Sequence, residues 1–229
     1  MNGVAMGIHE RKEREKEQRK EEIIDAAQRI FFEKGLIAST MDEIAEAAEL
    51  SKGTLYLYYS SKEDLYLAVM MRGMDTLHDM YEQIVNSDDS TVEKIIRCSN
   101  SYVDFFHSNR NFFRMFPFLQ NPRFHKQVSE EMIKSCGLKN QKMWDMVIAM
   151  LKKGMEEGKL RSDLNPVEVG IIFWSSSTAL LIREDSEGPA WKANLNIDFD
   201  HTLEVCNMLL MESILTDQGR KEYHALKKT

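Results

Sequence analysis

The chain has 229 residues, a formal net charge of −7 and no apolar run of the ~18 residues that a membrane-spanning helix needs. Its three cysteines, Cys98, Cys136 and Cys206, lie far apart, so the sequence predicts neither a disulfide framework nor a zinc site. The N-terminus lacks the apolar segment of a signal peptide. These features predict a reduced, cytoplasmic protein that does not span a membrane.

The first 19 residues form a predicted N-terminal arm that mixes basic and acidic side chains. Its basic members are Arg11, Lys12, Arg14, Lys16 and Arg19, and Lys20 follows directly after it. One interpretation is a solvated helical turn with ion pairs between residues i and i+4. The other is a flexible arm that contacts phosphates or the minor groove. Bulk charge does not decide between them, because residues 1–65 hold ten Lys/Arg against fourteen Asp/Glu.

Residues 40–65 show three helix starts in quick succession. Thr40 and Glu43 have the spacing of a capping box, Ser51 is a candidate N-cap, and Ser61 with Asp64 forms a third cap. Apolar residues at helical spacing follow the first cap, namely Met41, Ile44, Ala45 and Ala48. The spacing predicts a helix-turn-helix followed directly by another helix.

Three segments resemble the TetR (tetracycline-repressor-like) family of bacterial transcription regulators. They are S-K-G-T-L-Y-L-Y-Y-S-S-K-E-D-L at 51–65, I-I-D-A-A-Q-R-I-F-F-E-K-G at 23–35 and G-M-E-E-G-K-L-R-S-D-L-N-P at 154–166. The resemblance implies an all-α chain with a three-helix DNA-binding domain at 20–66. A ligand-binding and dimerisation domain would follow at 67–217, with a polar tail at 218–229.

The resemblance also implies which side chains touch a double-stranded DNA operator. The second helix of a helix-turn-helix lies in the major groove while the first crosses the backbone. The corresponding positions are Thr40, Ser51, Lys52, Gly53, Thr54, Tyr56, Tyr58 and Lys62. A lysine can donate to a guanine edge or a phosphate, and a tyrosine hydroxyl suits phosphate oxygens. Ordinary packing is the alternative for each tyrosine, and we assign Tyr59 to the core.

One residue departs from the family pattern. Family members usually have glycine in the turn, where this chain has Glu49. A glutamate in the left-handed conformation costs about 1 kcal/mol. Either the turn accepts that cost or it follows a different path.

The remaining sequence, with few glycines and four prolines, predicts helices throughout. We expect helices from Ser61 to about 86, from the Ser90 cap to about 109, from Asn121–Pro122 onward and through a long segment that ends at Gly158. Asn165–Pro166 opens the next helix, 185–197 reads as a loop, and Asp198 caps a last helix. The tail from Gln218 is expected to fray.

The middle of the chain is rich in phenylalanine and methionine, with fifteen methionines in all. Core filling is one interpretation, and a pocket for a small, largely apolar effector is the other. The candidate lining residues are Phe105, His107, Phe112, Phe113, Phe116, Met143, Trp144, Val147 and Phe173.

The last two long helices are candidates for homodimerisation. Small residues beside an apolar stripe allow a partner helix to approach closely, and family members dimerise through the equivalent pair. The candidate interface residues are Val169, Phe173, Ser176, Leu180, Leu203 and Leu210. A core within one chain is the alternative.

No motif for catalysis, a cofactor or a metal is visible. The sequence therefore predicts a regulator rather than an enzyme: a homodimeric repressor that binds a palindromic operator and is released by an apolar effector. One alternative is a DNA-binding protein of the same fold that a protein partner controls or that needs no small ligand. The other is a helical enzyme or lipid carrier in which the DNA-binding head, residues 20–66, is vestigial.

Overall fold

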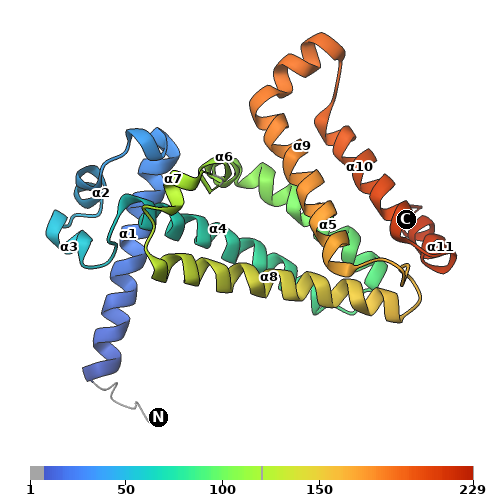
Figure 1. Ribbon diagram of the computed structural model, residues 1–229, viewed down its shortest axis with the longest axis horizontal. Coiled ribbons are helices and arrows are strands. Elements are labelled where there is room, and N and C mark those ends of the chain that lie inside the picture. The colour runs from blue at the N-terminus through green and yellow to red at the C-terminus, as the bar shows by residue number, and fades with distance from the viewer. Residues whose placement is uncertain (1–7, 120, 229) are drawn as a thin grey trace. The chain divides into compact units, whose positions relative to one another are not determined.

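Figure 1 shows the computed structural model, which describes residues 8–119 and 121–228. Within these two ranges the chain forms eleven helices and no strand, so the prediction of an all-α fold is confirmed. The predictions for residues 1–7 and for Thr229 lie outside the described residues. The helices are α1 (Ile8–Ala38), α2 (Met41–Ala47), α3 (Lys52–Tyr56), α4 (Lys62–Val85), α5 (Thr91–Ser108), α6 (Arg110–Leu119), α7 (Pro122–His125), α8 (Glu130–Glu156), α9 (Pro166–Leu195), α10 (Phe199–Ile214) and α11 (Asp217–Leu226).

The chain divides into two compact units. Unit 1 contains the residues up to Arg72 together with Met115–Gly137. Unit 2 contains Gly73–Arg114 together with the residues from Leu138 onward. The first part of α4 and the start of α8 therefore belong to unit 1, and the remainder of both helices belongs to unit 2.

Unit 1 has a core to which each of its first four helices contributes. The fully buried apolar members are Ile23, Ala26 and Ala27 of α1, Ile44 of α2, Leu55 of α3, and Leu65 and Val69 of α4. The spacing of Ile23, Ala26 and Ala27 places all three on one face of α1. Burial of these side chains fixes α2 and α3 against α1, which matters because both helices are too short to be stable alone.

Tyr66 of α4 joins this core to the later segment of unit 1. Its ring makes edge contacts with Phe31, Phe118 and Phe124 at centroid distances of 5.1, 5.6 and 5.7 Å. Its hydroxyl donates to the carbonyl oxygen of Met115 at 3.4 Å. Four aromatic rings from α1, α4, α6 and α7 thus form one cluster.

The N-terminal part of α1 is an exposed helix. Arg11 pairs with Glu15 at 2.8 Å and Arg19 with Glu22 at 2.6 Å. Residues 8–19 therefore form a solvated helix, as in the first of the two interpretations of the N-terminal arm. Each such exposed pair contributes little to stability. Near its other end, α1 is interrupted at Gly35, which has φ +72°.

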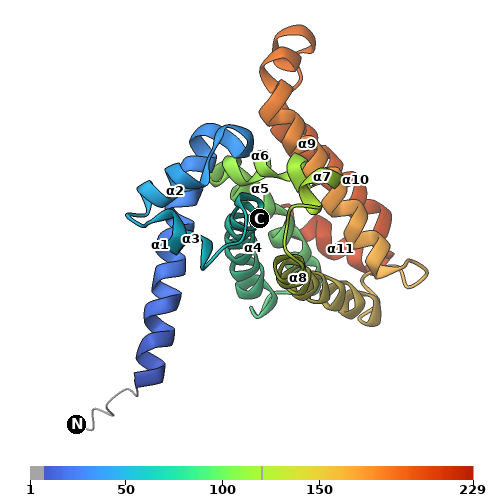
Figure 2. The same cartoon turned by 60° about the vertical axis from the view of Figure 1, so that its left-hand side comes forward.

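Unit 2 has its own apolar core, built from the end of α4 and from α5, α8, α9, α10 and α11. Its members include Ile95, Leu151, Val169, Met211 and Tyr223. In Figures 1 and 2 α9 and α10 run side by side, and these two helices share the most extensive contact between elements.

The predicted loop at 185–197 is wrong, because α9 continues to Leu195. Pro189 lies inside the helix and lacks one backbone hydrogen bond. Side chains compensate around it: the Trp191 indole donates to Glu187 at 2.8 Å, and Arg183 pairs with Glu187 at 3.1 Å. Trp191 also contacts the ring of Phe199 at 6.2 Å. The chain reverses only at Asn196, a left-handed residue with φ 53°.

The tail also differs from the prediction of a frayed end, because residues 217–226 form α11. Thr216 caps this helix, and its hydroxyl accepts a hydrogen bond from the Gly219 amide at 3.2 Å. Tyr223 is buried in the core of unit 2, so the tail packs through one apolar anchor.

We expect Gly219→Ala to lower the free energy of unfolding by about 1–3 kcal/mol. A Cβ atom at this position would lie 2.1 Å from the carbonyl oxygen of Lys159 and 2.8 Å from Leu215 Cδ2. Gly137→Ala is the matched control, since nothing lies within 4 Å there, and this change should stabilise α8 by about 1 kcal/mol. Urea denaturation measures both effects. A Gly219→Ala protein as stable as the parent would contradict the docking of α11.

Candidate nucleic-acid interface

The segment from α2 to α3 is held by the caps that the sequence predicts. Thr40 and Glu43 form a capping box: the Glu43 amide donates to the Thr40 hydroxyl at 3.2 Å, and the Thr40 amide donates to the Glu43 carboxylate at 2.9 Å. The Ser51 hydroxyl accepts from the Thr54 amide at 3.1 Å. Ser61 caps α4 in the same way, through the Asp64 amide at 2.9 Å. All three predicted helix starts are therefore confirmed.

The turn between α2 and α3 uses a left-handed residue. Glu49 has φ +55°. The Glu49 amide donates to the carbonyl of Glu46 at 3.0 Å, and the Leu50 amide donates to that of Ala45 at 2.8 Å. This pair of bonds defines a Schellman motif, whose C′ residue is left-handed and usually glycine. The turn does not follow a different path, and Glu49 bears the conformational cost.

The exposed side of α3 carries the residues that the sequence singled out. Lys52, Gly53 and Tyr56 are exposed, and Thr54 and Tyr58 are partly exposed. Leu55 points into the core and is fully buried. One buried leucine therefore fixes the helix and leaves a polar face free.

Tyr59 belongs to the core, as assigned. It is 8% exposed, and burial raises the pKa of its hydroxyl to about 12. The two preceding tyrosines are not buried. Packing therefore accounts for Tyr59 and leaves Tyr56 and Tyr58 available to a ligand.

The cations of this surface already have partners. Lys52 Nζ lies 2.9 Å from Asp42 Oδ2, and this hydrogen bond raises the pKa of Lys52. Lys34 pairs with Glu43 at 2.6 Å, and Lys62 donates to the carbonyl of Ser39 at 2.7 Å. Asp42 is a functional neighbour that the sequence analysis missed, since its contact with Lys52 spans ten positions. The carboxylates hold the lysines in place and reduce the positive potential of the surface.

The candidate effector residues fall into two groups. Phe105, Phe112 and Phe113 are buried and pack ring against ring, with centroids 5.9 to 6.2 Å apart around Phe105. Met143, Trp144, Val147 and Phe173 of unit 2 are partly exposed. Trp144 lies against Gly170 of α9 and meets the ring of Trp174 edge-on at 6.0 Å. Phe116, also partly exposed, belongs to unit 1.

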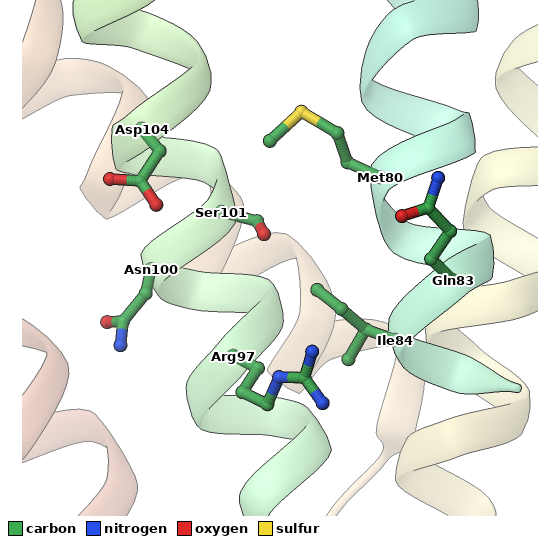
Figure 3. A pocket seen from close by; sticks show the side chains of 7 residues that line it. All are labelled: Met80, Gln83, Ile84, Arg97, Asn100, Ser101 and Asp104. Carbon is green, nitrogen blue, oxygen red and sulfur yellow. The ribbon is translucent and has the colours of Figure 1, made fainter. Parts of the chain in front are cut away.

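A separate groove of about 350 Å³ lies between α4 and α5 (Figure 3). Met80, Gln83 and Ile84 line it from α4, and Arg97, Asn100, Ser101 and Asp104 line it from α5. None of the nine candidate effector residues lines this groove. Its walls are mostly polar, so it does not fit the apolar pocket that the sequence predicts.

His107, a candidate polar residue of the pocket, instead faces Asp200, with Nε2 and Oδ1 3.1 Å apart. Together with Glu184 these side chains could in principle surround a cation, as could His78, Asp79 and Glu82. Arg110, however, lies 2.7 Å from Glu184 and 3.3 Å from His107 Nδ1. Its guanidinium already neutralises Glu184, so we interpret this cluster as an ion network that joins α5 and α6 to α9 and α10.

Two of the predicted dimer-interface residues are buried within the single chain. Val169 and Leu203 are buried in the described structure. Phe173, Ser176, Leu180 and Leu210 are partly exposed. The large apolar side chains that are exposed on α9 and α10 are not among the six predicted interface residues. They are Val167, Ile171, Ile172, Trp174, Leu195 and Leu209.

Residues 23–69 match the family model described as bacterial regulatory proteins, tetR family. The transcriptional repressor KstR2 of Rhodococcus jostii is 28% identical over 168 residues, which cover 72% of this chain and 78% of that protein. Residues 23–69 therefore form a TetR-type DNA-binding domain, and the chain is similar to TetR-family regulators over most of its length. The three-helix segment 20–66 is thus a DNA-binding domain, and the relatives that the chain resembles are transcriptional regulators rather than enzymes.

Solved structures of the family share the fold. FadR of Bacillus halodurans, a regulator of fatty acid degradation, superposes with a TM-score of 0.65 at 18% identity, covering 84% of this chain and 94% of that one. FadR of Bacillus subtilis, solved in complex with stearoyl-CoA, gives a TM-score of 0.63 at 19% identity, with 83% and 97% covered. None of the helices in the described ranges is long and apolar enough to cross a bilayer.

Because Glu49 occupies a left-handed position, we expect Glu49→Gly to raise the free energy of unfolding by about 0.5–1 kcal/mol. The gain is the relief of about 1–2 kcal/mol of strain, reduced by the greater freedom of glycine in the unfolded chain. Glu46→Gly, within the preceding helix, is the control and should destabilise the protein by about 1 kcal/mol. Thermal and urea denaturation measure both. Equal or lower stability of Glu49→Gly would mean that the turn is not strained.

Proposed function

We propose that this TetR-family protein is a cytoplasmic homodimeric repressor that binds an inverted-repeat operator and releases it when a largely apolar effector binds. The observation that carries the proposal is the polar face of α3. This face is fixed by a cap, a Schellman turn and one buried leucine, and it presents Lys52, Thr54 and Tyr56.

The chemistry of this face suits duplex DNA. The Lys52 ammonium can exchange Asp42 for a guanine edge or a phosphate oxygen, and Thr54 offers a hydroxyl and a methyl group. Tyr56 and Tyr58 can donate to phosphates, and Gly53 leaves room for close approach. Thr40 and Lys62, at the starts of α2 and α4, and Ser51, at the start of α3, would contact the DNA backbone.

The dimer proposal is supported by the exposed apolar surface of α9 and α10. Ile172 is 50% exposed and lies on the helix face that also carries Ser176 and Leu180, one and two turns further on. Leu209 of α10 is 61% exposed. A two-fold partner that buries this surface would place two heads on two half-sites.

The effector proposal is supported by the aromatic and methionine content of unit 2 and by a relative. The B. subtilis FadR structure contains stearoyl-CoA, a ligand with a long apolar chain. Met143, Trp144, Val147 and Phe173 are only partly buried, so they can change packing around a ligand at lower cost than Phe105 or Phe113. The alternative is a regulator of the same fold that a protein partner controls, without a small ligand.

Lys52→Ala and Tyr56→Ala should each weaken operator binding by about 1–3 kcal/mol and leave the protein folded. Each change removes one DNA-facing group and no core contact. Binding is measured by fluorescence anisotropy at matched salt, on a duplex selected from source-genome fragments. Lys142→Ala, at an exposed position of α8, is the control and should bind like the parent. Parent-like affinity of both head variants would exclude α3 as the reading helix.

Ile172→Asp should convert the dimer to monomers, because the change buries a carboxylate in the proposed interface. Sedimentation velocity measures the assembly state, and operator affinity should fall with it although the head is unchanged. Ile133→Asp, at another exposed isoleucine, is the control and should remain dimeric. An intact Ile172→Asp dimer would show that the interface lies elsewhere.

A further inference from the structure

Leu57 is, together with Ile37, one of the strongly exposed aliphatic residues of the head. It is 84% exposed, whereas the leucines that flank it on the same segment, Leu55 and Leu65, are fully buried. It is the C-cap residue of α3, with φ −72° and ψ −20°, and its amide donates to the carbonyl of Thr54 at 3.1 Å. The side chain therefore projects from a fixed backbone rather than from a flexible loop.

The surroundings of Leu57 belong to the proposed reading surface. It follows Tyr56, which is 45% exposed, and precedes the partly exposed Tyr58. An aliphatic side chain gains nothing from a phosphate, which binds cations and hydrogen-bond donors. In the major groove, however, one base presents an apolar group: thymine has a C5 methyl group that aliphatic side chains contact.

We propose that Leu57 is a specificity-determining residue that selects thymine by contact with its methyl group. This inference rests on the proposed function of the head, and it assigns the sequence preference of one position in each half-site. Lys52 and the tyrosines would supply polar contacts, while Leu57 would supply a contact that uracil cannot offer.

Removing methyl groups from the DNA, and from the protein at Leu57, tests the contact. The duplex is one selected by the parent protein, resynthesised with deoxyuridine in place of each thymidine in turn, so that single methyl groups are removed. The parent should lose affinity about fourfold at one thymine of each half-site, which is the effect of one buried methyl group. Leu57→Ala should bind the thymine duplex more weakly and should be insensitive to uracil at that position alone.

Two further variants make the result specific. Leu57→Met keeps an apolar side chain and should retain the preference for thymine. Ile37→Ala removes another strongly exposed apolar side chain, 83% exposed, and should leave every uracil effect unchanged.

The outcomes separate this inference from the proposed function. If the parent binds DNA selectively but tolerates uracil everywhere, or if Leu57→Ala keeps the full uracil effect, Leu57 does not read thymine and the proposed function stands. If the parent selects no sequence at all, the proposed function fails and this inference fails with it.

Discussion

The packing of Tyr66 is the constraint on which the rest of unit 1 depends. The three-helix head is small, and its core is completed by α6 and α7 through the rings around Tyr66. Asp64, one half-turn earlier, is buried and accepts a hydrogen bond from the Ser129 amide at 2.7 Å. Residues 115–137 are therefore structural parts of the head, although α8 carries the chain on from there into unit 2.

Local features of this fold were predictable from the sequence. Thr40, Ser51, Asn165 and Asp198 each cap a helix as predicted, because a cap is encoded within three or four residues. Gly158 adopts the expected left-handed conformation after α8. The polar face of α3 was predictable for the same reason, since the resemblance to a family identified its positions and the period of the helix identified its buried side.

Features that depend on distant residues were not predictable. Residues around Pro189 were predicted as a loop, but the helix continues there, and Trp191 packs against Phe199 of the next helix, a contact that the local sequence does not reveal. The tail read as frayed because it is polar, but Tyr223 anchors it in a core formed by residues far away in sequence. At the candidate site, the pairing of Lys52 with Asp42 and the exposure of Leu57 both depend on how the turn orients α3. The phenylalanines of the middle segment were ambiguous because a packed cluster and a pocket wall have the same composition.

On the proposed function, the α3 surfaces of two copies read DNA as a two-fold unit. Selection of bound duplexes from a random-sequence library by the purified parent protein, followed by sequencing, tests it most directly. We expect enrichment of one sequence made of two inverted half-sites, with centres about 34–36 Å or a multiple of that distance apart. A library that stays unenriched, or one that yields only a single asymmetric half-site, would contradict it.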